Sequence, residues 1–410
     1  MLSFTKRSEY VKNPILEMDA LAAELSRKGR DVIKLNRGDP PLYFKTPTYM
    51  IEAYIEALKE NMTNYSSASG TAELKEAVSR RYKRMYGVSV DHAGVIATAG
   101  VTEALSFINH SMIEKGDSAI LFRPHYPQYL PRLMSENGTP VYCDQLMEQD
   151  WDVHLEGFEL KIASLKRSGR IKHVKYVIVT NPCNPTGKTI PRKTLARIAE
   201  LSNENNLLII SDEIYDEIVY HGAKFTSMSE AAVGIPHILL NGSSKNYDST
   251  GFRVGFIVIP GDDKTSMSLK EKFTDYALTR LSINTPAQHA VAEGINNVKE
   301  HRKAMKAMVK GMQERAETTV RAIRGNRHLD VVMPDSTFYV FPRIRLSGLD
   351  FRTGDEFVKS ALLEEGVQLT RGSAFGAPSN FRIVALPGKE VLEEAMSRIN
   401  RMCARHSRTP

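Results

Sequence analysis

The sequence has little cysteine and lacks any long apolar run. Its three cysteines, Cys143, Cys183 and Cys403, are widely spaced, and an odd, sparse set argues against a disulfide framework and for a reducing compartment. No Cys-x-x-Cys pair is present, so we expect no metal site. The longest apolar runs, such as Leu207–Ile210, are too short to span a bilayer. Because Met1–Tyr10 also lacks the apolar core of a signal peptide, we expect a cytoplasmic protein that does not enter a membrane.

The charge shows no strong bias either. There are 55 Lys and Arg residues against 48 Asp and Glu residues, a net charge of +7, and the basic residues are spread without a run of five or more. A nucleic-acid-binding protein normally carries a basic cluster or stripe, so we expect no nucleic-acid partner. The 410 residues, 42% hydrophobic and 25% charged, are typical of a soluble protein with several domains, or with one large and one small domain.

Short apolar segments alternate with helical segments between about residues 94 and 260. This alternation of strands and helices predicts an α/β fold, in which helices cover both faces of a mostly parallel sheet. Ligands bind such sheets in the loops at the carboxyl ends of the strands. The predicted strands are Val95–Thr98, Ser118–Phe122, Val141–Cys143, Val174–Thr180, Leu207–Ser211, Ile238–Leu240 and Phe256–Ile259, with helices over 102–115 and 191–204.

A smaller α+β unit is predicted to follow, with the N-terminal segment packed against it. An amphipathic helix over 14–29 cannot bury its apolar face alone, and Asn36–Pro41 breaks the chain into a loop. Further elements are expected as a long helix over 285–325, strands at Val331–Met333, Phe338–Ile344 and 381–386, and helices at 355–365 and 389–404. We therefore expect a large domain, 42–285, and a small domain made of 1–41 and 286–410.

The most informative stretch of the chain is Ser243–Gly255. Lys245 lies close to an apolar strand, and a lysine that loses its hydration has a lowered pKa and can attack an aldehyde as a neutral amine. Ser243 and Arg253 supply donors and a fixed positive charge that suit a phosphate. An aldehyde that carries a phosphate describes pyridoxal 5'-phosphate (PLP). Most lysines are solvated surface charges, so this interpretation depends on the other motifs.

Two of these motifs each follow a predicted strand. Gly100, in Thr98–Ala104, precedes a helix start, where backbone N–H groups form an anion site; a simple strand-to-helix turn is the alternative. Asn184 lies in Asn181–Gly187, where two Asn-Pro pairs make the loop rigid. A rigid loop can aim the amide of Asn184 at a fixed target, and a plain turn is again the alternative.

Asp212 and Tyr215 follow another strand. An aspartate at the carboxyl end of a strand can hold a pyridine nitrogen protonated through a charge-assisted hydrogen bond, although it is also a common helix N-cap. Tyr215, three residues later, would lie on the same helical face and reach the ring hydroxyl. Tyr126 would stack on the ring, with a half-buried core tyrosine as the alternative.

Along the chain the motifs follow in the order glycine turn, tyrosine, Asn-Pro loop, Asp-x-x-Tyr, Ser-Lys and arginine. Together they match what one planar phosphorylated aldehyde requires. From about residue 30 to the C-terminus, the chain resembles the fold-type I PLP-dependent aminotransferases of class I/II, above all the alanine and aspartate enzymes. The most specific pieces are Asn-Pro-x-Asn-Pro-Thr-Gly, Ser-Asp-Glu-Ile-Tyr and the Ser243–Gly255 segment. The resemblance implies the type I fold of PLP-dependent transferases, with PLP as cofactor.

The resemblance also implies a role for each motif residue. Lys245 would carry PLP as an internal aldimine and move the proton between the substrate and the cofactor, while Asp212 would keep the pyridine nitrogen protonated. Asn184 and Tyr215 would hydrogen-bond the ring hydroxyl, and Tyr126 would stack on the ring. The implied phosphate ligands are Gly100, Val101, Thr102, Ser243 and Arg253. Family members often have a serine three positions before the lysine; Gly242 stands there, and Ser243 is expected to serve instead.

Substrate and subunit contacts follow from the same resemblance. Arg382 would bind the substrate α-carboxylate, assisted by Asn184 and the backbone of Gly38. Tyr65 matches a tyrosine that reaches the phosphate of the neighbouring subunit, which implies a homodimer with active sites at the interface. Arg280 is either an ordinary surface arginine or a contact for a distal substrate carboxylate across that dimer.

Three functions are compatible with these motifs. The first is an aminotransferase of amino-acid metabolism and biosynthesis, which passes the amino group of an L-amino acid to a 2-oxo acid such as 2-oxoglutarate. Alanine is the favoured donor, because Ile96–Leu105, His125–Tyr129 and Tyr339–Arg343 look most like prokaryotic alanine aminotransferases, although the aspartate and aromatic branches share much of them. The second is a PLP-dependent carbon–sulfur β-lyase on the same scaffold. The third, a non-catalytic regulator, is disfavoured because the lysine, aspartate and arginine of the motifs are intact.

Overall fold

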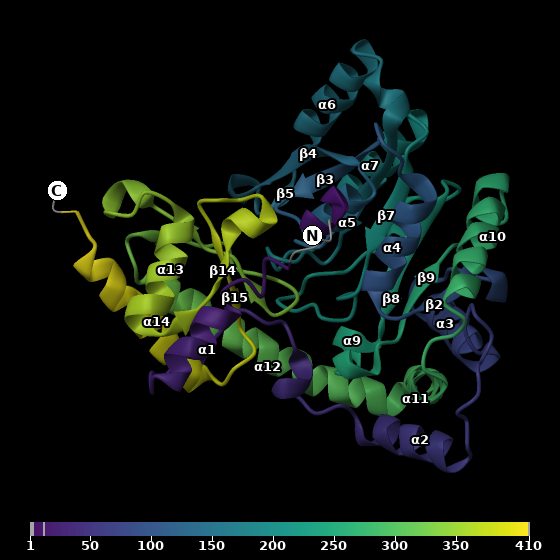
Figure 1. Cartoon of the computed structure of the whole chain (residues 1–410), viewed down its shortest axis with the longest axis horizontal. Coiled ribbons are helices and arrows are strands. Elements are labelled where there is room, and N and C mark those ends of the chain that lie inside the picture. Colours follow the sequence, from purple (N-terminus) through teal and green to yellow (C-terminus); the bar gives the residue numbers. More distant parts are fainter. Residues whose placement is uncertain (1–3, 11–12, 409–410) are drawn as a thin grey trace.

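The computed structural model describes residues 4–10 and 13–408, and its central element is an eight-stranded sheet in the order β2-β9-β8-β7-β6-β3-β4-β5 (Figure 1). Neighbours from β8 through β7, β6 and β3 to β4 are parallel, whereas β9 is antiparallel to β8 and β2, and β5 is antiparallel to β4. The expected α/β fold with a mostly parallel sheet is confirmed. The strands are β2 (Val95–Thr98), β3 (Ser118–Arg123), β4 (Thr139–Leu146), β5 (Asp152–Val153), β6 (Val174–Thr180), β7 (Leu208–Asp212), β8 (His237–Gly242) and β9 (Gly255–Val258).

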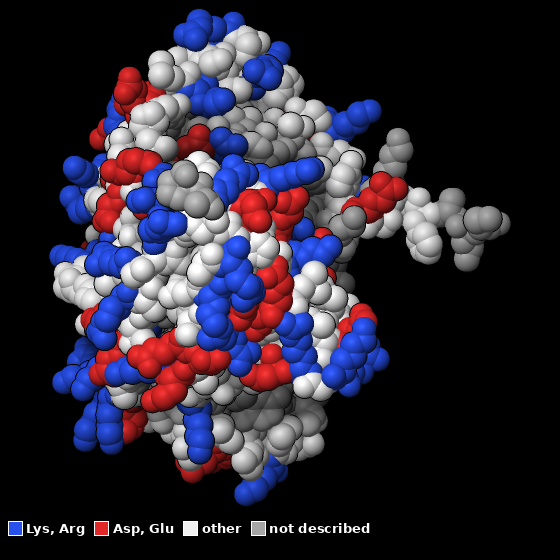
Figure 2. Space-filling model, turned by 90° about the vertical axis from the view of Figure 1, so that its left-hand side faces the viewer, with Lys and Arg blue, Asp and Glu red and all other residues white. Residues whose placement is uncertain are grey.

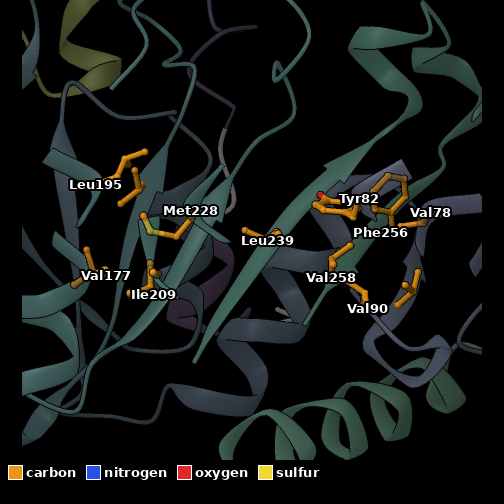
Figure 3. Close-up of a cluster of buried hydrophobic side chains, with 14 of the residues drawn as sticks. Val78, Tyr82, Val90, Val177, Leu195, Ile209, Met228, Leu239, Phe256 and Val258 are labelled. Carbon is orange, nitrogen blue, oxygen red and sulfur yellow. The ribbon is translucent and has the colours of Figure 1, made fainter. Parts of the chain in front are cut away.

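Helices cover both faces of this sheet, because successive residues of its central strands point to opposite sides. On one face, Ile209 of β7 belongs to a cluster that includes residues of α3 and α7 (Figure 3). Its neighbour Ile210 belongs to a cluster on the other face with residues of α4 and α10. Both faces of the central strands are buried, so these strands are largely apolar runs, which is why the sequence predicted them. The predicted Val141–Cys143 covers only part of β4, and β5 was not predicted. The helices on this part are α2 (Thr48–Lys59), α3 (Ala72–Tyr86), α4 (Val101–Met112), α5 (Tyr129–Ser135), α6 (Leu155–Arg167), α7 (Arg192–Glu204), α8 (Met228–Ala231), α9 (Ser243–Asn246), α10 (Lys264–Thr279) and α11 (Thr285–Asn296).

A second core joins the N-terminal segment to the C-terminal third of the chain. Strand β1 (Ile33–Lys34) pairs in parallel with β13 (Val367–Gln368), and Leu35 is buried among residues of the last three helices. In Figure 1, α1, α13 and α14 gather at the left, and α12 runs along the lower side toward the large sheet. The remaining elements are α1 (Asp19–Arg27), α12 (Val298–Arg324), β10 (Leu329–Asp330), β11 (Tyr339–Val340), β12 (Arg343–Ile344), α13 (Gly354–Glu365), β14 (Thr370–Arg371), β15 (Phe381–Val384) and α14 (Lys389–Arg405). The division at 42–285 stays a prediction.

The structure differs from the expected elements in the C-terminal third. The helix over 285–325 is broken at Asn297, whose ψ of 62° ends α11 before α12 begins. The strand at Val331–Met333 was wrong, because the paired residues are Leu329–Asp330. The expected strand Phe338–Ile344 is split into β11 and β12, since Pro342 between them has no N–H to donate.

Opposite charges are interspersed on the face shown in Figure 2. On α14, Arg398 pairs with Asp31 at 2.6 Å, and Arg405 pairs with Glu365 at 2.6 Å and with Glu364 at 2.9 Å. Basic residues on this helix are therefore paired with nearby acidic side chains rather than gathered in a basic patch. None of the helices in residues 4–10 and 13–408 is long and apolar enough to cross a membrane.

We expect Ile209→Ala to destabilise the protein strongly, because Ile209 is fully buried in the central strand β7. A large-to-small change in such a core costs about 2 to 4 kcal/mol of unfolding free energy, measurable by chemical denaturation. Leu160→Ala on α6 is the control, since Leu160 is 61% exposed and its loss should cost under about 0.5 kcal/mol. Equal destabilisation by the two changes would contradict the assignment of this core.

Candidate functional site

A cavity of about 430 Å³ lies at the carboxyl edge of the large sheet. The strand register explains its position, because Thr180 pairs with Asp212 and Asp212 pairs with Leu240, so β6, β7 and β8 end side by side. The loops after these strands meet residues of the second core at this edge. The predicted site residues that line the cavity are Gly38, Gly100, Val101, Thr102, Tyr126, Asn184, Asp212, Tyr215, Lys245, Arg253 and Arg382.

Lys245 lies in the short helix α9, directly after β8. Its Nζ donates a hydrogen bond to the carbonyl oxygen of Gly38 at 2.6 Å. Burial lowers the pKa of Lys245 to about 8; the positive charges of Arg382 and Arg253 add to this effect, and Asp39 opposes it. A larger share of the amine is therefore neutral near pH 7, which is the state that attacks an aldehyde.

The N-terminus of α4 lies beside the guanidinium of Arg253. Gly100 is the N-cap residue of this helix with a φ of 78°, and a Cβ there would come within 2.5 Å of the Arg253 guanidinium. That guanidinium donates to the carbonyl oxygens of Thr250 at 2.9 Å and Ala99 at 3.2 Å. Within the described part of the chain, no carboxylate forms an ion pair with Arg253. The helix terminus and this cation together fit a phosphate.

The two serines before Lys245 differ in whether they line the cavity. Ser243 is fully buried, and its Oγ donates to the carbonyl oxygen of Val254 at 3.2 Å. Ser244 lines the cavity, whereas Ser243 does not. The sequence pattern pointed to a serine in this segment, but only the backbone conformation of α9 determines which of the two faces the cavity.

Asp212 ends β7 and is buried beneath the cavity. Its Oδ2 accepts a hydrogen bond from the Tyr129 hydroxyl at 2.7 Å, and its Oδ1 accepts one from the Ile214 N–H at 3.3 Å. Burial raises the pKa of Asp212 to about 6, and these two hydrogen bonds oppose the rise. The carboxylate is thus ionised at neutral pH and able to accept from a cationic N–H group. Tyr129 was not singled out from the sequence, although it belongs to the same motif as Tyr126.

Tyr215 lies in a turn over residues 214–217 rather than in a helix, so the helical-face argument for it was wrong. It still lines the cavity with Asp212, and its hydroxyl is 2.9 Å from the hydroxyl of Tyr339. Tyr126 is half-buried and contacts Tyr129 edge to face, with ring centroids 5.4 Å apart.

Arg382, in β15, is a buried cation without an ion-pair partner among the described residues. Its Nη1 donates to Asn184 Oδ1 at 2.9 Å and its Nη2 to the carbonyl oxygen of Asn36 at 2.6 Å. The guanidinium lies over the Tyr339 ring at 4.5 Å, and its buried Nε has no hydrogen-bond partner. A buried charge is costly when it is not matched, so this geometry suits an anionic ligand such as a carboxylate. Asn184, whose Oδ1 is engaged, keeps its NH₂ group for a ligand acceptor.

A buried ion-pair network supports the segments that carry Lys245 and Tyr215. Asp216 accepts hydrogen bonds from Arg81 Nη2 at 2.8 Å and from Asn246 Nδ2 at 2.6 Å. The Arg81 and Asp216 side chains are 1% and 0% exposed. Because Asn246 follows Lys245 and Asp216 follows Tyr215, the network fixes the two site residues relative to each other.

Two further predicted residues lie outside the cavity. Tyr65 is 76% exposed on the surface. Arg280 forms an ion pair with Glu103 at 3.0 Å and donates to the carbonyl oxygen of Ala97 at 2.6 Å, so its charge is matched within its own chain.

Several lining residues were not singled out from the sequence. Asp39 and Thr250 are hydrogen-bonded to each other at 2.6 Å and lie in motif segments. Ile15 and Tyr339 come from distant segments; Tyr339 opens the quoted segment Tyr339–Arg343, but no site role was assigned to it from the sequence. Together, the amine, the α4 N-terminus with Arg253, the buried carboxylate and the unmatched arginine fit the flat, phosphorylated aldehyde PLP beside a carboxylate-bearing molecule.

Comparisons with known proteins agree with this geometry. The family model "Aminotransferase class I and II" matches residues 30–399. An aspartate aminotransferase of Bacillus sp. (strain YM-2) is 32% identical over 391 residues, 94% of this chain and 95% of that protein. An alanine aminotransferase of Mycobacterium bovis is 30% identical over 389 residues, 92% of this chain and 87% of that protein. The solved alanine aminotransferase of Pyrococcus furiosus superposes with a TM-score of 0.93 at 32% identity, covering 98% of this chain and 100% of its own.

We expect the Lys245 amine of the cofactor-free protein to react with acetic anhydride with a midpoint near pH 8, the value to which burial lowers its pKa. At pH 7, about one amine in ten would be neutral, against about one in three thousand for an ordinary lysine. Peptide mass spectrometry measures the labelling rate against pH, with the 58% exposed Lys272 as the reference amine. A midpoint above pH 10 at Lys245 would contradict the lowered pKa.

Proposed function

Because this chain belongs to the class I and II aminotransferases, and is therefore a PLP-dependent enzyme, we propose that it passes the amino group of an L-amino acid, preferably alanine, to a 2-oxo acid such as 2-oxoglutarate. The observation that carries the proposal is the presence of two basic side chains in one cavity, the half-buried Lys245 and the buried Arg382. Lys245 has the lowered pKa needed to bond the PLP aldehyde, and Arg382 has no carboxylate of this chain to match its charge.

The cavity residues would hold PLP by its three polar ends. The N-terminus of α4 and Arg253 suit the phosphate, and Asp212 suits the pyridine nitrogen. The Asn184 NH₂ group and the Tyr215 hydroxyl would donate to the ring oxygen. We propose that Ser244, which lines the cavity, supplies the hydroxyl that was expected from Ser243. When bound, PLP supplies an electron sink for the pair of electrons left at the substrate α-carbon.

The chain's own part in the chemistry is binding and proton transfer. Arg382 would bind the α-carboxylate and thereby point the α-hydrogen toward Lys245. The Lys245 Nζ would accept this proton and later give it up again, so that it would act as the general base and then the general acid of the transfer. An amine with a pKa of about 8 is well matched to such a general base near neutral pH.

We prefer alanine as the donor because three local segments, Ile96–Leu105, His125–Tyr129 and Tyr339–Arg343, look most like prokaryotic alanine aminotransferases. Arg280, the candidate from the sequence for a distal carboxylate, is matched by Glu103, so the second carboxylate of aspartate or of 2-oxoglutarate would need another partner. Relatives of both specificities are found at similar identity, so aspartate or aromatic donors remain the alternative. A carbon–sulfur β-lyase on the same scaffold is distinguished by its products, because it releases ammonia and pyruvate without an acceptor acid.

We further propose a cytoplasmic homodimer with active sites at the interface. Support comes from an apolar stripe on the outer face of α2, where Ile51, Ile55 and Leu58 are 42%, 46% and 50% exposed, and from the exposed Tyr65, which would reach the neighbouring phosphate. Such a stripe is typical of a subunit contact. The cytoplasmic location is supported by three free, buried cysteines.

A panel of amino donors with 2-oxoglutarate tests the activity. We expect alanine to give the highest kcat/KM, with aspartate about tenfold lower, because one extra group in a pocket that fits a methyl side chain costs about 1 to 3 kcal/mol of transition-state binding. Lys245→Ala should abolish turnover, and borohydride reduction of the wild type should leave a pyridoxyl group on Lys245 by mass spectrometry. An adduct on another residue, or none, would remove the proposal, and a higher kcat/KM for aspartate would remove the alanine preference.

Replacing the carboxylate-binding arginine should separate substrate binding from cofactor binding. We expect Arg382→Ala to raise KM for every amino donor by about two to three orders of magnitude, the usual effect of losing a buried charged hydrogen-bond partner, while PLP stays bound. Steady-state kinetics and the cofactor absorption spectrum measure the two effects. Arg343→Ala is the matched control, because Arg343 lies on β12 with a side chain that is 39% exposed and paired with Glu148, away from the cavity. An unchanged KM for Arg382→Ala would show that the carboxylate binds elsewhere.

A further inference from the structure

Tyr339 links two side chains with separate proposed roles. Its hydroxyl is 2.9 Å from the Tyr215 hydroxyl, and its ring lies 4.5 Å from the Arg382 guanidinium. It lines the cavity and is 2% exposed. A Cβ on Gly38 would collide with this hydroxyl, so the hydroxyl rests against the same glycine whose carbonyl oxygen holds Lys245.

A packing role alone does not account for the Tyr339 hydroxyl. The neighbouring buried aromatic residues Phe338, Phe341 and Phe375 fill space without a polar atom. A buried hydroxyl costs free energy unless it is hydrogen-bonded. At position 339 the hydroxyl has a defined partner, Tyr215, which points to a polar role.

The direction of this hydrogen bond follows from counting protons. Each tyrosine hydroxyl carries one proton and can donate once. If Tyr215 donates to the PLP ring oxygen, its own oxygen must accept from Tyr339. The chain of donors then runs from Tyr339 to Tyr215 to the ring oxygen, and each bond in such a chain strengthens the next.

We propose that Tyr339 is a positioning residue that strengthens the hydrogen bond from Tyr215 to the cofactor and holds the substrate-binding guanidinium of Arg382 against its ring. This inference rests on the proposed function, because it assumes that PLP and a carboxylate occupy the cavity. Tyr339 would therefore contact both Arg382, which binds the substrate, and Tyr215, which donates to the cofactor.

The expected effect has a definite sign. The negatively charged ring oxygen of PLP would stabilise the proton on the nitrogen that joins Lys245 to the cofactor. A stronger hydrogen bond to this oxygen reduces that stabilisation, and therefore lowers the pH at which the nitrogen loses its proton. The titratable groups that face Tyr339 are Tyr215, Arg382, Asp212 and Tyr126. None of these groups is removed in Tyr339→Phe, so the change isolates one hydroxyl.

The test is a pH titration of the absorption band of bound PLP in the holoenzyme. We expect Tyr339→Phe to raise the midpoint by about 0.3 to 0.7 pH unit, the scale of a cooperative contribution to one charged hydrogen bond. Because the ring that supports Arg382 is kept, KM for alanine should stay within about twofold. Tyr339→Leu removes the ring as well, and should raise KM about three- to tenfold through the lost cation–π contact.

A double variant distinguishes this chain of donors from a general disturbance. Tyr339→Phe should have no effect on the midpoint in a Tyr215→Phe background, because the intermediate hydroxyl is gone. Tyr220→Phe is the matched control: Tyr220 is also buried and donates to the Ser336 carbonyl oxygen at 3.0 Å, yet it does not line the cavity. The pH midpoint of the PLP absorption band in Tyr220→Phe should equal that of the wild type.

If Tyr339→Phe does not fold, 3-fluorotyrosine in place of Tyr339 tests the same bond, because it keeps the hydroxyl, makes it a stronger donor and should lower the midpoint. An unmoved midpoint in either variant, or an equal shift with and without Tyr215, overturns the inference. A wild type that binds no PLP or transfers no amino group would instead overturn the proposed function. The two failures are therefore distinguishable.

Discussion

The site depends on the burial of two basic side chains that no carboxylate of this chain matches with an ion pair in the described residues. Burial disfavours the charged form of a lysine, and the amine of Lys245 responds with a pKa of about 8. An arginine stays charged, so Arg382 is held instead by an amide oxygen, a carbonyl oxygen and an aromatic face. Removal from water thus has two effects: it makes the Lys245 amine a nucleophile, and it leaves the Arg382 cation suited to an anionic ligand.

The sheet explains how residues so far apart in sequence serve one cavity. Parallel strands bring their carboxyl ends to one edge, and the segments after β6, β7 and β8 supply Asn184, Asp212 and Lys245 there. The second core then adds Arg382 and Tyr339 from the opposite side. Neither part holds the whole site, so the packing between them determines the geometry at which an acid group, an amine and an aromatic face meet.

Local sequence patterns predicted the buried strands and the polar motifs at their ends, because both depend on residues that are adjacent in the sequence. Strands such as Val174–Thr180 were found because both faces of the sheet are covered and most residues of the strand are apolar. Motif residues at strand ends were found because their chemistry is explicit in the sequence. The break at Asn297, the choice between Ser243 and Ser244, and the contributions of Ile15 and Tyr339 depend on tertiary packing. These features have no counterpart in periodicity or composition, because they arise where distant segments meet.

The ion pair between Arg81 and Asp216 has a consequence for the conditions under which the site stays assembled. Dissolved ions screen charges that face water, such as those along α14, but they reach a fully enclosed pair only weakly. The attachment of the Lys245 segment to the Tyr215 turn is therefore insensitive to ionic strength. High salt would loosen the outer surface of the molecule well before it altered the arrangement of groups around the cavity.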